Sequence, residues 1–97
     1  MAHVVAPPDL SARIDDYLTY LFDVMDDMLE VDADWDTWDD IEQLDFVIEW
    51  DIKRDRLGQL ADWEKQGLLS RAQSQRYRKL LEVVDQRQPI IDRLLAE

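Results

Sequence analysis

The 97-residue chain is predicted to be an all-α protein, either a three-helix bundle or a long helical hairpin with an additional N-terminal helix. Two observations support this prediction. The chain has only two glycines, and its apolar residues recur every three or four positions instead of alternating. A single domain is expected at this length. The predicted order is a mobile tail over residues 1–7, then helices over about 8–31, 36–66 and 70–88, with a short continuation over 89–96.

The first helix is predicted from an apolar stripe with an acidic face opposite to it. Pro8 suits the first turn of a helix, and Asp9 suits its positive end. Apolar residues spaced by three and four form the stripe: Leu10, Ile14, Tyr17, Leu18, Leu21, Val24, Met25, Met28 and Leu29. Acids occupy the other side: Asp15, Asp16, Asp23, Asp26, Asp27 and Glu30. These six residues, called here the acidic face, are the predicted interaction surface; the alternative is that they only keep an oligomer soluble.

The second helix is predicted to be apolar on two sides. Asp36 or Thr37 is the expected N-cap, and Gly67 is expected to end the helix in a left-handed conformation. One stripe contains Trp38, Ile41, Leu44, Ile48 and Ile52, and the other contains Phe46, Trp50, Leu57 and Ala61. Such a helix must be covered on both sides, by the rest of the chain or by a second subunit. The predicted apolar anchors of an interface are Phe46, Trp50 and Leu57.

The third helix is predicted to begin with a capping box and to bend near its end. Ser70 supplies the N-cap hydroxyl and Gln73 the third helical position. Because a proline removes one backbone hydrogen bond, we expect a kink at Pro89, or a stop near Gln88 and a restart.

Charge is distributed unevenly along the chain, whose net charge is −12. Residues 1–51 contain sixteen acids and one basic residue, whereas residues 52–97 contain seven acids and ten basic residues. A strongly acidic protein repels nucleic acid and anionic membranes and attracts basic surfaces. Cysteine is absent, no apolar run is long enough to span a bilayer, and no secretory signal is visible. We therefore expect a cytoplasmic protein.

Two acidic groupings were considered as metal sites. Asp32, Asp34 and Asp36 have the first spacings of a calcium-binding EF-hand loop. Thr37 stands where that loop needs glycine, and Gln43 stands where it needs a bidentate glutamate. The interpretation we prefer is that these acids cap helices on a solvated loop.

A second grouping resembles a known enzyme motif. Residues 26–30 read Asp-Asp-Met-Leu-Glu, and residues 42–45 read Glu-Gln-Leu-Asp. This pattern is similar to the acidic motif of the MazG-like all-α nucleoside-triphosphate pyrophosphohydrolases. The resemblance implies carboxylates from two helices that would hold magnesium ions against substrate phosphates. The chain has Asp where the family favours Glu, and the helical wheel places Asp26, Asp27 and Glu30 opposite the apolar stripe.

The sequence favours a non-catalytic, acidic protein–protein interaction module that self-associates into a homo-oligomer. We predict no catalytic residue, no metal site and no cofactor, and no direct binding to nucleic acid or membrane. One alternative is an acidic inhibitor, a DNA mimic or an antitoxin-like protein that binds a basic partner. The further alternative is the MazG-like nucleotide pyrophosphohydrolase.

Overall fold

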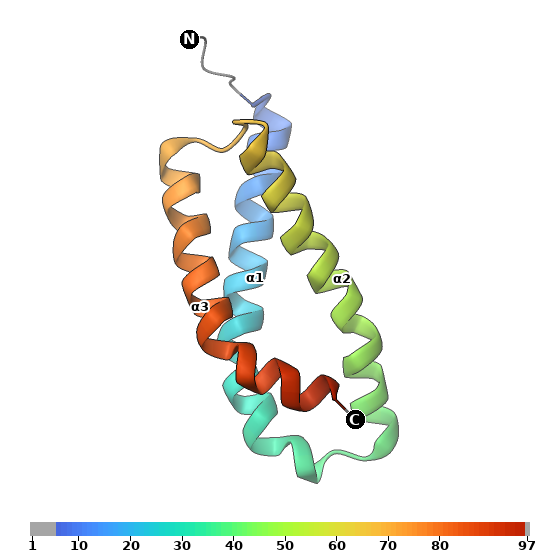
Figure 1. Ribbon diagram of the computed structural model, residues 1–97. Helices are drawn as coiled ribbons and strands as arrows, with labels where there is room; N and C mark the ends of the chain where they lie inside the picture. Colours follow the sequence, from blue (N-terminus) through green and yellow to red (C-terminus); the bar gives the residue numbers. More distant parts are fainter. Residues whose placement is uncertain (1–5, 97) are drawn as a thin grey trace.

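The computed structural model describes residues 6–96, which form three α-helices joined by short connections (Figure 1). The elements are α1 (Pro8–Asp34), the 3₁₀ helix η1 (Trp35–Thr37), α2 (Asp40–Lys65) and α3 (Arg71–Leu95). The prediction of an all-α fold is confirmed, and the described residues contain no strand. The tail predicted over residues 1–7 falls mainly on residues 1–5, which lie outside the described part.

α1 forms around its apolar stripe and ends later than predicted. Five side chains of the stripe are buried: Ile14, Leu18, Leu21, Met25 and Met28. The predicted end was near residue 31, but the helix continues to Asp34 and η1 follows directly. Trp35 stands seven residues after Met28, hence on the same side of a helix, and is only 7% exposed. The stripe therefore continues for one more turn, and burial of Trp35 keeps this acidic segment helical.

α2 begins at Asp40, four residues after the predicted start. Its N-cap is Asp39, not Asp36 or Thr37, so this part of the prediction is wrong. The backbone N–H of Glu42 donates to Asp39 Oδ1 (2.8 Å), and the backbone N–H of Asp39 donates to Glu42 Oε1 (3.3 Å). Of Asp36, Thr37 and Asp39, only Asp39 is followed three residues later by a glutamate, which completes this reciprocal capping box.

The connection from α2 to α3 follows the prediction. Gly67 has φ +75°, and its N–H donates to the carbonyl of Glu64 (3.0 Å) while Leu68 donates to Trp63 (3.0 Å). These two bonds form a Schellman motif, which needs a residue that tolerates positive φ. At the start of α3, the N–H of Gln73 donates to Ser70 Oγ (3.1 Å), as expected for a capping box.

α3 bends near Pro89 and crosses toward the start of α2 (Figure 1). The predicted kink is confirmed, although the helix continues to Leu95 without a stop. The bend brings Leu94 to a fully buried position, and Arg93 forms an ion pair with Asp32 of α1. The last turns of α3 therefore close the end of the bundle where α1 is connected to α2.

The molecule is elongated, with principal extents of 52 × 22 × 18 Å. α1 packs mainly against α3, and α2 diverges from α1 toward its own N-terminal end (Figure 1). α2 therefore has one side toward the other two helices and a long opposite side without an intramolecular partner.

Candidate interaction surface

The inward side of α2 is its aromatic stripe. Trp50 is 4% exposed, and its ring stacks on that of Phe46 with centroids 6.1 Å apart. Phe46 also meets Trp35 edge to face at 5.4 Å, and Leu57 packs half-buried against the same core. The three predicted apolar anchors therefore lie in the intramolecular packing and not on a free surface, which corrects the sequence interpretation. Large aromatic side chains remove more apolar area from water, so this side faces inward.

The outward side of α2 is the aliphatic stripe. The side chains that follow Trp38 along it are all exposed: Ile41 (71%), Leu44 (56%), Ile48 (59%) and Ile52 (52%). We call these four residues the α2 row. Their spacings of three and four place them on one side of three helical turns. Exposed apolar residues are ordinary when they occur singly, whereas a contiguous group on a small protein marks an interaction surface.

The remaining large exposed apolar side chains are isolated. Leu29 on α1 is 51% exposed and Leu81 on α3 is 43% exposed. Neither has a second such residue one turn away on its own helix within the described residues. Among the elements that the structure describes, the α2 row is the one contiguous exposed aliphatic group.

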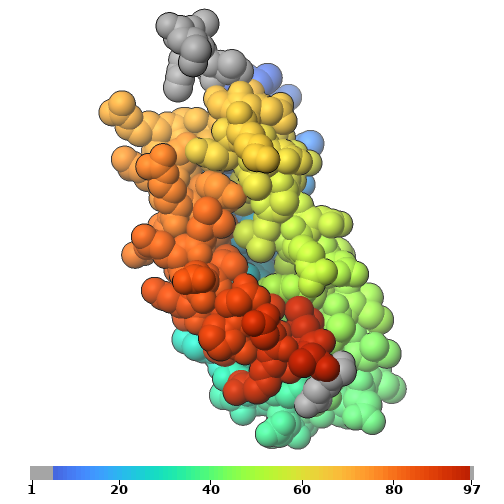
Figure 2. Space-filling model, in the orientation of Figure 1, coloured from blue at the N-terminus to red at the C-terminus, as the bar shows by residue number. Residues whose placement is uncertain are grey.

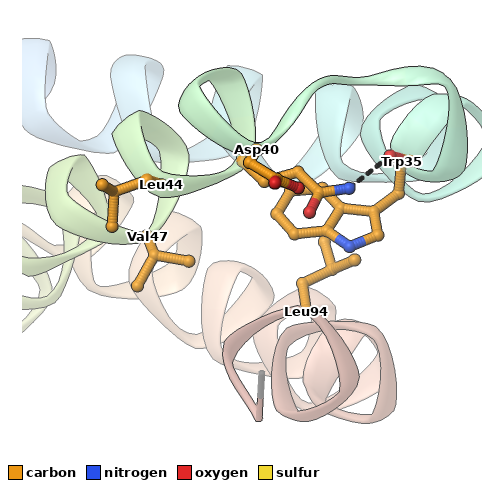
Figure 3. A pocket seen from close by; sticks show the side chains of 6 residues that line it. Trp35, Asp40, Leu44, Val47 and Leu94 are labelled. Carbon is orange, nitrogen blue, oxygen red and sulfur yellow. Dashed lines mark hydrogen bonds between the residues drawn. The ribbon is translucent and has the colours of Figure 1, made fainter.

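A pocket adjoins the α2 row near the start of the helix (Figure 3). Its volume is about 230 Å³, and it is lined by Trp35, Asp40, Gln43, Leu44, Val47 and Leu94. The side-chain amide of Gln43 donates to the Trp35 carbonyl (2.8 Å), the bond drawn as a dashed line, which fixes η1 against α2. Leu44 belongs to both the row and the pocket, so the apolar surface continues from α2 toward the bent end of α3.

A second pocket lies further along the hollow between α2 and α3 (Figure 2). Its volume is about 210 Å³. Trp50 and Leu57 line it from α2, and residues on both sides of the Pro89 bend, including Val84 and Ile91, line it from α3. At this pocket the edge of the aromatic side of α2 is accessible, whereas the α2 row lies on the outward side of the helix.

The acidic face of α1 is exposed along its whole length. The side chains of Asp16, Asp23, Asp26, Asp27 and Glu30 are all exposed. Asp15 is also exposed but has partners on α3, because Arg76 forms an ion pair with it (3.6 Å) and Gln73 donates to its Oδ1 (3.0 Å). The acidic face is therefore available to solvent, with Asp15 held at the junction with α3.

The acidic groupings considered as metal sites do not converge within residues 6–96. No group of three His, Cys, Asp or Glu side chains in this range is placed to hold a metal ion. Asp32 pairs with Arg93 instead of facing Asp34 and Asp36. The acids of residues 26–30 and 42–45 are exposed on two helices. The carboxylates of the MazG-like pattern thus form no group that could hold a metal ion within residues 6–96.

One titratable side chain in the core has a shifted pKa. Burial raises the pKa of the Tyr77 hydroxyl, and the negative charge of Glu64 raises it further. Both effects disfavour the phenolate, so Tyr77 stays neutral in the folded protein well into alkaline conditions. The side chain is 8% exposed and belongs to the core.

The outward position of the α2 row has a signal in the sequence. Asp45 and Glu49 lie beside the row on one flank, Asp51 lies beside it on the other, and Asp55 follows it one turn beyond Ile52. Acids on both flanks indicate a side turned to water, whereas the aromatic stripe has fewer acids close to it. Charge density beside each stripe would therefore have distinguished the two.

Comparison with known proteins finds no relative: no protein-family model, curated protein or solved structure matches the chain. Among the described residues, no helix combines the length and apolar character that crossing a membrane requires.

Proposed function

We propose that the protein is a non-catalytic interaction module that docks another protein through the α2 row. The observation that supports this is the exposure of four aliphatic side chains, between 52% and 71%, in one continuous line. Full burial of such a side chain contributes about 1.5–3 kcal/mol. Covering the row would therefore supply a substantial part of a binding free energy.

The structure of α2 also supports a docking role. Capping boxes hold the N-terminal ends of α2 and α3, and Gly67 fixes the turn between them. The inward aromatic cluster holds α2 from the opposite side. The row is therefore presented on a rigid helix, and little conformational entropy is lost when a partner binds.

Site-specific photo-cross-linking tests this proposal. Benzoylphenylalanine replaces Ile48 in the row and, as a matched control, Gln86 on the exposed side of α3. In cells of the source organism, position 48 is expected to form a discrete adduct that position 86 does not form. The adduct is identified by mass spectrometry, and its purified partner is then bound to the purified chain. Equal labelling from both positions, or failure of the purified pair to bind, would contradict the proposal.

The exposed acidic face of α1 supports a second candidate function, an acidic inhibitor or DNA mimic. Five of its carboxylates are exposed and form no ion pair in the described structure: Asp16, Asp23, Asp26, Asp27 and Glu30. They present spaced negative charges to solvent, as the phosphates of DNA do. The same experiment distinguishes the two functions when benzoylphenylalanine also replaces Asp27. Adducts from position 27 to a DNA-binding protein, with none from position 48, would favour the mimic.

A further inference from the structure

The residues beside the α2 row are acidic on both flanks. At 100° per residue, Asp45 and Glu49 follow the row on one side and Asp51 precedes it on the other, while Asp55 stands in line with the row, one turn beyond Ile52. All four side chains are exposed. Asp51 pairs with Arg54 on the same helix (3.7 Å), whereas the other three form no ion pair within residues 6–96. The row is therefore an apolar line with acids on both sides, most strongly on the side of Asp45 and Glu49, and with Asp55 beyond its last residue.

Apart from Arg54, which pairs with Asp51, the basic residues in the middle of α2 do not offset these charges. The Lys53 ammonium lies 5.7 Å from the ring centroid of Phe46 on the inward side. The Arg56 guanidinium lies 5.1 Å from the ring of Tyr17 and 4.7 Å from that of Tyr20, both on α1. Cation–π attraction to these rings holds both charges toward the bundle. The outward side of α2 is left acidic.

We infer that the occupant of the α2 row is a basic amphipathic helix of another protein, with an apolar line flanked by Lys or Arg. This inference rests on the proposed docking function and adds the chemistry of the partner. An apolar helix face with acidic borders is complementary to an apolar helix face with basic borders, the arrangement of helix-in-groove recognition. The row extends from Ile41 to Ile52, twelve residues whose ends lie about 16 Å apart along the helix axis, which corresponds to three turns of the partner.

A second copy of the chain fits the row less well. In a symmetric dimer the same patch serves both subunits, so the acids around the row, Asp45, Glu49, Asp51 and Asp55, would face acids around the row of the other subunit. Like charges brought together across an interface oppose association. The acidic borders of the row thus argue for a different, basic protein instead of the self-association predicted from the sequence.

Three designed peptides of about 18 residues, long enough for five helical turns, test the inference against the purified full chain. The first has a Leu line flanked by Lys and Arg, the second has the same line flanked by Glu, and the third is a scrambled version of the first without an apolar line. Isothermal titration calorimetry at low and high salt measures binding. The first peptide is expected to bind one to one, at least about tenfold more tightly than the others, with an affinity that falls as salt rises.

Matched variants of the chain locate the binding site. Ile48→Ser is expected to weaken the basic peptide about tenfold, because one apolar contact is lost. Leu81→Ser removes a similarly exposed apolar side chain from α3 and is expected to leave the affinity unchanged. The double variant Asp45→Asn and Glu49→Gln is expected to weaken binding at low salt and to reduce its salt dependence.

Four results would overturn the inference. Equal affinity for the basic and acidic peptides would show that charge does not select the partner. If Leu81→Ser weakened binding of the basic peptide as much as Ile48→Ser does, the peptide would not bind at the α2 row. No peptide binding, together with a dimer in sedimentation that Ile48→Ser abolishes, would give the row to a second copy and contradict the docking of another protein as well. A monomer that binds no peptide and forms no adduct from position 48 would contradict both the inference and the docking function.

Discussion

The side-chain amide of Gln73 donates a hydrogen bond to Oδ1 of Asp15 over 3.0 Å and so joins the start of α3 to α1. The same nitrogen lies 3.1 Å from the carbonyl of Ser11 and 3.2 Å from its hydroxyl. The amide oxygen accepts from the N–H of Ser70 (2.9 Å). Gln73 is 5% exposed, and both of its polar atoms have partners. Asp15, predicted to be part of the acidic face, thus also holds the bundle together.

Replacing Gln73 should destabilise the fold. Gln73→Ala removes the bonds to α1 and half of the capping box, and we expect the free energy of unfolding to fall by about 1–3 kcal/mol. Urea denaturation followed by circular dichroism measures this change. Gln75→Ala, at an exposed position of the same helix, is the control and should stay within about 0.5 kcal/mol of the parent. Equal effects of the two variants would contradict the role assigned to Gln73.

Local signals in the sequence predicted most of the fold. Gly67, the Ser70 capping box and the bend at Pro89 each depend on residues within one or two turns, and all three appear as expected. The start of α2 was misplaced because several acids and Thr37 in one short segment are all suitable N-caps. The structure selects Asp39 through its reciprocal bonds with Glu42.

The choice of N-cap gives a paired test. Asp39→Ala should lower the free energy of unfolding by about 1 kcal/mol, because the N–H of Glu42 loses its acceptor. Asp36→Ala removes one of the two residues that the sequence predicts as N-cap. Asp36 accepts no capping bond in the described structure. Its effect should stay within about 0.5 kcal/mol. Thermal denaturation of both variants checks the difference, and a larger loss for Asp36→Ala would restore the earlier assignment.

The stability of the protein should fall at high pH in part through Tyr77. Burial and Glu64 raise the pKa of this hydroxyl in the folded state above its ordinary value, 10.0. The contribution of this hydroxyl to the free energy of unfolding is therefore complete below its pKa in the unfolded chain, about 10. It is lost as pH rises toward the pKa in the folded protein. Tyr77→Phe lacks the titrating group, so its unfolding free energy should decline less between neutral and strongly alkaline pH. Parallel declines in the two proteins would contradict this assignment.

The two glycines of the chain should respond to alanine with opposite signs. Gly67 has φ +75°, and alanine in that conformation costs about 1–2 kcal/mol. Gly58 lies inside α2, and a Cβ added there meets nothing within 4 Å. Gly58→Ala should therefore raise the free energy of unfolding by about 0.5–1 kcal/mol. Urea denaturation of both variants measures the sign of each change in the free energy of unfolding. Stabilisation by Gly67→Ala would contradict the Schellman motif.

The spacing of apolar residues in α2 does not by itself predict which side faces inward, because that depends on packing against α1 and α3. Both stripes have the spacing of a buried face, and local periodicity does not rank them. The structure buries Trp50 to 4% exposure and leaves Ile48 at 59%. The docking proposal depends on this assignment, since an inward α2 row could not receive a partner.

A pair of substitutions tests the orientation of α2 directly. Trp50→Ala removes a stacked core ring and should lower the free energy of unfolding by about 3–5 kcal/mol. Ile48→Gln replaces an outward side chain with a polar one of similar length and should change it by no more than about 0.5 kcal/mol. Tryptophan fluorescence and circular dichroism during urea denaturation measure both. A large loss for Ile48→Gln with a small one for Trp50→Ala would mean that α2 is turned the other way, and the α2 row would then belong to the core.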